Sequence, residues 1–208
     1  PQARCQGDFD IYLDYFGKNS ISYLDVDDGS SDNCGNLAGY YLYKLLDLNT
    51  TIHAASTTPS DATICSGTDT GTADKAIDGN TDPNFANCSS FLSQSANNPR
   101  ITVGLGESVY LHTVRIYNSS VGSPLTNFTV FFGTNITFAS AYTTTYTGPA
   151  VSGYVDIPIP AGTMGQYVRV TLNGTGLQLG IAEVEFYGSK ASQSLTSIGF
   201  ECEDIRYT

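Results

Sequence analysis

The sequence predicts an all-β protein built as an antiparallel β-sandwich. From residue 52 onward, short runs of β-branched and aromatic residues are separated by clusters of Gly, Pro, Asn and Ser, a pattern typical of sandwiches and barrels. Within the runs, apolar and polar residues alternate with the period of two that turns one face of a strand toward a core. A chain of 208 residues is long enough for one such domain with extensions.

We expect residues 1–50 to form an N-terminal extension. Apolar and polar residues alternate over 8–13, which predicts a strand. The acidic segment 25–33 departs from the spacing of an EF-hand and is interpreted as a solvated loop. Residues 35–48 fit either a helical stripe or a Tyr-rich strand, and we favour a short helix there.

The sandwich itself is expected over residues 51–188. Its most regular runs lie at 101–107, 109–117, 125–133, 165–172 and 181–188. Alternation within the runs and in the segment before residue 160 predicts the main core residues, which are Phe128, Val130, Phe132, Val155, Ile157, Ile159, Val168, Val170, Leu172, Val184 and Phe186. The Thr-rich segment 142–146 suits an exposed strand or an O-glycosylated loop.

The last segment, residues 189–208, is interpreted as a C-terminal arm. It begins with a polar run and ends in an apolar stretch that contains Cys202. A terminal segment of this composition is expected to pack on a partner. The partner is either the N-terminal extension of the same chain, through a bond from Cys202 to Cys5 or Cys34, or a neighbouring subunit.

The charge and hydropathy of the chain exclude two classes of partner. Twenty acidic residues against nine basic ones give a net charge of −11, which repels nucleic acid and anionic lipid. An uninterrupted apolar stretch of about 18 residues is absent, so we expect no membrane insertion. The chain lacks a signal-peptide pattern, and we expect Pro1 to follow a cleavage site.

Sequons and cysteines together indicate a secreted glycoprotein. The six N-x-Ser/Thr sequons are potential sites for N-linked glycans and lie at Asn49, Asn87, Asn118, Asn127, Asn135 and Asn173. The cysteines lie at Cys5, Cys34, Cys65, Cys88 and Cys202. Because five is an odd number, at least one thiol is free or bonded to another chain, and the residues themselves leave the pairing open.

The pattern of reactive residues argues against an enzyme. The sequence contains no G-x-S-x-G, P-loop, HExxH or CxxC motif. Its two histidines, His53 and His112, fall in predicted strands, and we expect His112 to be partly buried beside Val114. Glu183 and Glu185 resemble a carboxylate pair, but a metal ligand beside a surface glutamate explains them equally well.

One turn offers a candidate metal site. Asp78, Asn80 and Asp82 supply hard oxygen donors within five residues around Gly79, and such donors suit Ca²⁺. An Asx-rich turn that binds no ion is the alternative, because Asn and Asp side chains close turns on their own backbone.

Several ordered blocks of the sequence resemble a known family. The blocks KAIDGN, VRIYN, LTNFTVFFG, GQYVRVTL and AEVEFYG occur in this order. Over about residues 52–188 the chain resembles the discoidin, or coagulation-factor type C, family, with the F-type lectins (fucolectins) as the most similar branch. This resemblance implies a jelly-roll, galactose-binding-like sandwich.

The resemblance also implies a structural Ca²⁺ and a disulfide. The ion would be held by the side chains of Asp78 and Glu183 and by the backbone carbonyls of Lys75, Asn80 and Asn87. In the lectins the cysteine that matches Cys88 pairs with one that matches Ala182 here. Cys88 therefore needs another partner, and Cys65 is the nearest candidate.

The sugar ligands of the F-type lectins are missing from this chain. The lectin histidine corresponds to Ser90, and the two lectin arginines correspond to Ser119 and, approximately, to Ser123 or Pro124. A tandem Trp of the lectins is replaced by Arg100-Ile101, and the chain contains no Trp. A glycan on Asn118 would stand in the mouth of the inherited sugar pocket.

The sequence is compatible with two functions. The first is a non-catalytic structural subunit of an extracellular filament or coat, which associates with copies of itself through the terminal arms. The alternative is a calcium-dependent carbohydrate-binding or adhesion module whose sugar site has been rebuilt, for example around Phe91, Tyr117 and Tyr146.

Overall fold

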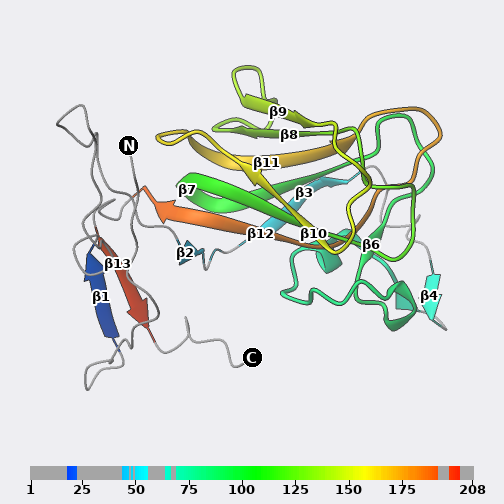
Figure 1. Cartoon of the computed structure of the whole chain (residues 1–208), viewed down its shortest axis with the longest axis horizontal. Helices are drawn as coiled ribbons and strands as arrows, with labels where there is room; N and C mark the ends of the chain where they lie inside the picture. The colour runs from blue at the N-terminus through cyan, green and yellow to red at the C-terminus, as the bar shows by residue number, and fades with distance from the viewer. Residues whose placement is uncertain are drawn as a thin grey trace.

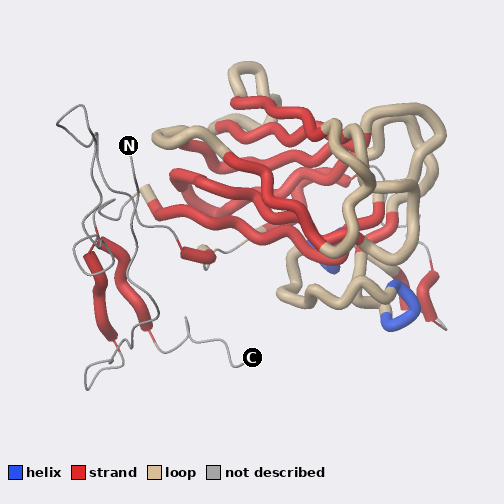
Figure 2. Tube along the Cα trace, in the orientation of Figure 1, coloured by secondary structure: helices blue, strands red, loops and turns tan. Residues whose placement is uncertain are grey.

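The structure of the protein is a computed structural model, and it describes residues 18–22, 44–46, 48, 50–55, 64–66, 69–191 and 197–201. Almost all regular structure in this part is strand, as Figure 2 shows. The two described helical turns are short 3₁₀ segments, η2 (Ala73–Ala76) and η3 (Phe85–Asn87). The prediction of an all-β, antiparallel protein is confirmed.

Nine strands are joined in one hydrogen-bonded system (Figure 1). Its main path runs β2-β12-β7-β11-β8-β9, and β3, β6 and β10 pair at its sides. These strands are β2 (Lys44–Leu45), β3 (Thr51–Ala55), β6 (Phe91–Leu92), β7 (Arg100–Asn118), β8 (Phe128–Gly133), β9 (Tyr142–Tyr146), β10 (Tyr154–Pro158), β11 (Met164–Leu172) and β12 (Gly180–Lys190).

Strand β7 links the two sides of the sandwich. Its first part pairs with β3 and with most of β11, and its second part pairs with β12, β10 and the start of β11. Gly106 separates the parts and has a φ of 75°, a left-handed value that glycine adopts at little cost. The runs 101–107 and 109–117, expected as separate units, are therefore one continuous strand.

The core lies where the alternation places it. Phe128, Val130 and Phe132 of β8 are at most 1% exposed. The same holds for Val168, Val170 and Leu172 of β11, while Val155 is half-buried. Alternate burial along neighbouring strands lets their apolar side chains fill one interior.

His112 is exposed, contrary to the expectation that it would be partly buried. Strand β12 pairs its consecutive residues Tyr187 and Gly188 with Thr113 and Leu111, so His112 is an extra residue on β7. Such a bulge breaks the period of two. It therefore leaves Leu111 and Val114 in the core and His112 outside.

The terminal segments pair with each other. β1 (Lys18–Ser22) and β13 (Ser197–Glu201) form a separate antiparallel sheet, with Lys18 opposite Glu201 and Ser22 opposite Ser197. This pairing supplies the C-terminal arm with a partner in its own chain, one of the two alternatives that the sequence left open. The strand expected at 8–13, and Cys5, Cys34 and Cys202, lie outside the described residues.

Residues 44–46 belong to the sandwich rather than to a helix. β2 pairs with the end of β12, and Leu46 is buried in the core. In this part, the short helix favoured for 35–48 is wrong, because a sheet edge was available to pair with this backbone. A small sheet of β4 (Ile64–Ser66) and β5 (Asp69–Thr70) precedes η2. In the described ranges, none of the helical segments has the length and apolar character to cross a membrane.

Candidate functional site

A ladder of side-chain hydrogen bonds shapes the loop that follows η2. The carboxylate or amide oxygens of Asp78, Asn80, Asp82 and Asn84 each accept a hydrogen bond from the backbone N–H two residues further on, at 3.0–3.2 Å. Four successive Asx turns of this kind fix the loop without regular secondary structure. Asp82 also accepts from the Asn87 amide at 2.9 Å, and this bond is the main reason that its pKa is lowered.

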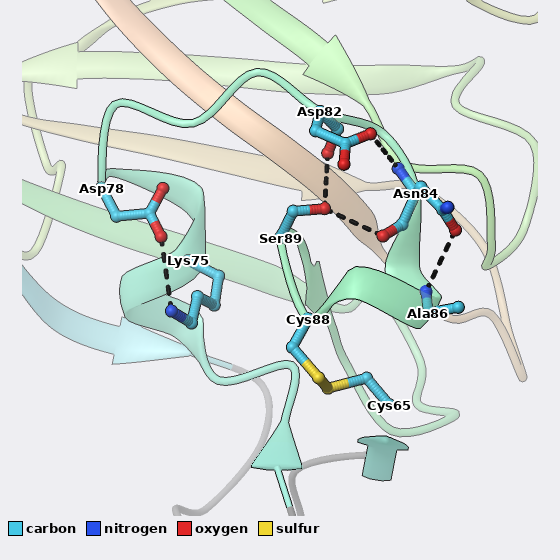
Figure 3. The surroundings of a disulfide bond; sticks show 8 residues. All are labelled: Cys65, Lys75, Asp78, Asp82, Asn84, Ala86, Cys88 and Ser89. Carbon is cyan, nitrogen blue, oxygen red and sulfur yellow. Dashed lines mark hydrogen bonds and ion pairs between the residues drawn. A yellow bond between two sulfur atoms is a disulfide. The ribbon is translucent and has the colours of Figure 1, made fainter.

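The far end of the loop is tied to the rest of the domain, as Figure 3 shows. The Ser89 hydroxyl donates to the backbone carbonyls of Asp82 (2.7 Å) and Asn84 (2.9 Å). Cys88 forms a disulfide with Cys65 of β4, with a Cα–Cα distance of 5.3 Å. Cys65, the nearest candidate in the sequence, is thus the partner of Cys88 in the structure.

Glu183 of β12 closes the near end of the loop. Its Oε2 accepts a hydrogen bond of 2.9 Å from the Gly79 N–H, across 104 residues of sequence. Glu183 is only 4% exposed. Burial raises the pKa of Glu183 to about 7, and the neighbouring carboxylates of Asp78 and Glu185 add to the rise, although the Gly79 hydrogen bond opposes it.

Two of the residues predicted to hold calcium, Asp78 and Glu183, lie near each other at this end of the loop. Glu183 bonds to the N–H of Gly79, the residue after Asp78, and Lys75 contacts Asp78 at 3.5 Å. The Asn87 side chain bonds to Asp82 instead. A buried carboxylate that faces other carboxylates is stabilised by a bound cation, and the donors are hard oxygens. These two carboxylates therefore suit Ca²⁺ as ligands.

Main-chain oxygens would have to complete such a site. Among the described residues, no group of three or more His, Cys, Asp or Glu side chains is arranged to hold a metal ion. The ligand set implied by the resemblance also depends on main-chain oxygens, because it contains only two carboxylates besides three backbone carbonyls. Calcium itself stays a prediction.

The positions assigned to the lectin sugar ligands are neighbours in space. Ser90 and Ser119 are buried, at 0% and 3% exposure, and their hydroxyl oxygens lie 2.8 Å apart. Ser123 instead receives a hydrogen bond from the Gln178 N–H and donates its own N–H to the Gln178 carbonyl. The polar groups that remain at these three positions are engaged within the protein.

The aromatic residues suggested for a rebuilt sugar site do not form one cluster. Phe91 is fully buried, so its ring is inaccessible to a ligand. The ring of Tyr146 stacks on Phe128 with centroids 5.0 Å apart, and its hydroxyl donates to the Pro149 carbonyl. Tyr117 belongs to a different group on β7, where its hydroxyl donates to Glu185.

The group around Tyr117 was not predicted from the sequence. Glu185, expected at the surface, is 9% exposed and accepts hydrogen bonds from Tyr117 (3.2 Å) and Tyr187 (2.7 Å). Arg115 makes two hydrogen bonds to Asp156, at 2.7 and 2.9 Å. This ion pair lowers the pKa of Asp156 and raises that of Arg115. The available signal was the recurrence of Arg-x-Tyr, Tyr-x-Asp and Glu-x-Tyr at outward positions of three strands.

The sequons differ in their surroundings. Asn87, Asn127 and Asn135 are exposed, and Asn127 lies in a left-handed turn just before β8. Asn118 and Asn173 are half-buried, and the Asn173 amide donates to the Thr129 hydroxyl at 2.9 Å. Thr129, expected on an outward face with Asn127, is itself buried. Asn49 lies outside the described part of the chain.

Comparison with known families gives one match. Residues 75–170 match the model described as NedA-like, galactose-binding domain, of the F5/F8 type C group. Over these residues the sandwich is similar to galactose-binding-like domains of the discoidin type. The matched segment runs from η2, just before the Asx-turn loop, into β11. The same sequence finds no match among curated proteins.

Solved structures with a similar fold include three sugar-binding proteins. The F-lectin (fucolectin) from striped bass (Morone saxatilis) serum is 24% identical, with a TM-score of 0.58 over 74% of this chain and 52% of that chain. The Streptococcus pneumoniae fucose binding module SpX-3 is 22% identical, with a TM-score of 0.55 over 70% and 97%. The lectin domain of lectinolysin, solved with Lewis B antigen, is 23% identical, with a TM-score of 0.55 over 69% and 94%. At these identities, the similarity establishes the discoidin-type fold.

Proposed function

We propose that this protein is a non-catalytic, secreted glycan-binding module that does not use the fucose ligands of the F-type lectins. The main support is the extent of the likeness, since about 70% of this chain covers nearly the whole of two sugar-binding modules. The aligned region is a complete binding unit in those proteins. Because a fold by itself does not fix a function, the proposal depends on binding experiments.

Because the sugar-binding side chains of the F-type lectins are absent, we do not expect this protein to bind fucose as those lectins do. Ser90 and Ser119 bond to each other in the interior, so they offer no charged donor to a sugar hydroxyl. A terminal fucose would therefore find neither the histidine nor the arginines that the resemblance associates with it. The proposed specificity is for a glycan that does not depend on fucose.

We further propose that Ca²⁺ braces the module without touching the glycan. Asp78 and Glu183 would hold the ion by side chain, and Lys75, Asn80 and Asn87 by backbone carbonyl. When bound, the ion would neutralise the buried Glu183 carboxylate and lock the Asx-turn loop against β12. The disulfide between Cys65 and Cys88 is consistent with the oxidising compartment that secretion implies.

A glycan array tests the function directly. The full chain, labelled and clustered to compensate for weak single-site affinity, is applied to immobilised neutral oligosaccharides with calcium present. We expect selective binding that free fucose does not reverse. An array without any selective signal, or a signal lost on addition of free fucose, would contradict the proposal.

A structural subunit of an extracellular filament or coat is the second candidate. It is favoured by the cysteine count, because the bond between Cys65 and Cys88 leaves three others, at Cys5, Cys34 and Cys202. Three thiols cannot all pair with one another, so one is available to another molecule. A non-reducing gel and light scattering of the full chain and of a chain without residues 190–208 test it. A monomer with a free thiol would remove this candidate.

A further inference from the structure

A connected group of aromatic and charged side chains lies on the outward side of the three strands β10, β7 and β12. In the strand register, Tyr154 lies opposite Tyr117, and Asp156 lies opposite Arg115, which in turn lies opposite Glu185. The intervening residues, such as Ile116, point into the core. We call this surface the Tyr154 face, and its six side chains are Tyr154, Asp156, Arg115, Tyr117, Glu185 and Tyr187.

Hydrogen bonds hold the polar part of the Tyr154 face in one arrangement. Arg115 bonds to both carboxylate oxygens of Asp156, and its Nη1 donates to the Tyr187 hydroxyl at 3.3 Å. The buried Glu185 carboxylate accepts from the Tyr187 hydroxyl underneath. Because Arg115 is fixed on two sides, little further ordering is required when a ligand binds.

Tyr154 stands out from this arrangement as an exposed ring. It is 52% exposed, although the Arg115 guanidinium carbon lies 4.3 Å from its ring centroid. The Tyr117 ring supports it from the side, with centroids 5.4 Å apart and an interplanar angle of 48°. A Cβ added at the neighbouring Gly153 would meet nothing within 4 Å. One side of the ring is thus braced by the protein, and the opposite side is open to solvent.

We propose that the Tyr154 face binds a neutral hexopyranose unit of a glycan, which stacks on the open side of Tyr154 and hydrogen-bonds to Asp156 and Arg115. The proposal rests on the function proposed above and assigns it a site. This site shares no residue with the inherited pocket, where Ser90 and Ser119 are closed off.

The chemistry of the face selects this class of ligand. A pyranose presents C–H groups on one side of its ring, which pack on an aromatic surface, and hydroxyls at its edge that both donate and accept. Asp156 has an exposed carboxylate, with a side-chain exposure of 45%, and a guanidinium has more N–H groups than the three that Arg115 uses here. Adjacent acceptors and donors of this kind suit adjacent hydroxyls.

A charged ligand fits the face less well. The Arg115 charge is already matched by Asp156 in a two-pronged pair, and Glu185 adds a further carboxylate. The face therefore offers no unpaired cation to a sulfate or phosphate group. Its single exposed ring is also small for a stable protein interface, which typically buries about 800 Å² on each partner.

The test uses the glycan that gives the strongest array signal and compares variants of the full chain by titration. We expect Tyr154→Ala to weaken binding at least tenfold and Tyr154→Phe to weaken it less than threefold, since the ring remains. Met164→Ala is the matched control, because Met164 is the other exposed large apolar side chain on the described surface, at 42%, and lies on β11. It should bind like the unmodified chain.

A second variant guards against misfolding. Arg115→Lys keeps the charge but loses the two-pronged bond to Asp156, and it should also weaken binding at least tenfold, with a melting curve recorded for each variant. If the unmodified chain binds a glycan and both Tyr154→Ala and Arg115→Lys bind it equally well, the site is wrong while the function stands. If the unmodified chain binds no glycan, both proposals fail.

Discussion

The hydroxyl oxygens of Ser90 and Ser119 lie 2.8 Å apart across 29 residues of sequence, and both side chains are buried. The resemblance assigned these two positions to ligands of one sugar, and residues that touch one sugar must be neighbours. Their contact is consistent with the assignment, and at these two positions the structure has a buried hydrogen bond between hydroxyls. The contribution of this hydrogen bond to the free energy of unfolding can be measured.

A double-mutant cycle on Ser90 and Ser119 should reveal this bond. Ser90→Ala alone leaves the Ser119 hydroxyl buried with a weaker contact, from the Val121 N–H at 3.4 Å, and should lower the free energy of unfolding by about 1–2 kcal/mol. The double variant should cost less than the sum of the single ones. Urea denaturation measures all four proteins, and strict additivity would show that the hydroxyls are independent.

Glu183 should make the ion-free protein sensitive to pH. Its pKa in the fold is raised from 4.5 to about 7, so the folded state binds this proton more tightly than the unfolded chain. The associated stability is present below the unfolded pKa and is lost as the pH rises through the folded pKa. In EDTA, we expect the melting temperature to fall from about pH 5 to about pH 8, and calcium to reverse most of that loss at the upper end.

Glu183→Gln separates the ion from the proton. The variant should melt higher than the unmodified chain in EDTA at the alkaline end, because a buried charge is removed, and calcium should no longer stabilise it. Glu107→Gln is the matched control, since Glu107 forms a surface ion pair with Lys190 and should change little. A full calcium response in Glu183→Gln would rule out this carboxylate as a ligand.

The bond between Cys65 and Cys88 should stabilise the domain by about 2–4 kcal/mol. It ties β4 to the end of the Asx-turn loop, and it closes a loop with a sequence separation of 23. We expect the double variant Cys65→Ala/Cys88→Ala to unfold at a lower urea concentration, because its unfolded chain is no longer constrained by the cross-link. Unmodified protein treated with a reductant is the control, and equal midpoints for all three would contradict the prediction.

Two substitutions remove the sequon at Asn173, and they should differ in their effect on the free energy of unfolding. Asn173→Gln loses the amide bond to Thr129, a buried hydroxyl, and should cost about 1 kcal/mol. Thr175→Ala removes the same sequon at an exposed position and should cost almost nothing. Both are compared in protein made without glycosylation, and equal stabilities would show that the Asn173 bond contributes nothing.

The strands could be predicted from the sequence where burial follows a strict period of two. The run 168–172 meets that condition, and the run 128–132 departs from it only at Thr129, which is buried together with its apolar neighbours. His112 does not, because a bulge against β12 shifts the alternation by one residue. Bulges depend on the pairing partner, and a single run of sequence does not contain that information.

The candidate calcium site and the Tyr154 face differ in how far each depends on the pairing of strands that are distant in the sequence. Asp78 and its neighbours form a local loop, so their spacing alone indicated a turn of oxygen donors. The Tyr154 face is assembled from three strands, and Arg115 meets Asp156 across 41 residues. Only the register of β10 on β7 brings them together. The alternation of apolar and polar residues does not predict this register, because it marks the outward residues of each strand without showing which strands pair or with what offset.

The pairing of β1 with β13 has a mechanical consequence. Lys18 and Glu201, the outermost residues of the pair toward the chain ends, lie opposite each other. A pulling force applied at the two termini would therefore load one hydrogen bond at a time and open this sheet like a zipper. The sandwich lies between Ser22 and Ser197 in the chain, so it would bear tension only after the small sheet had opened. The paired ends would then act as a sacrificial link in series with the domain.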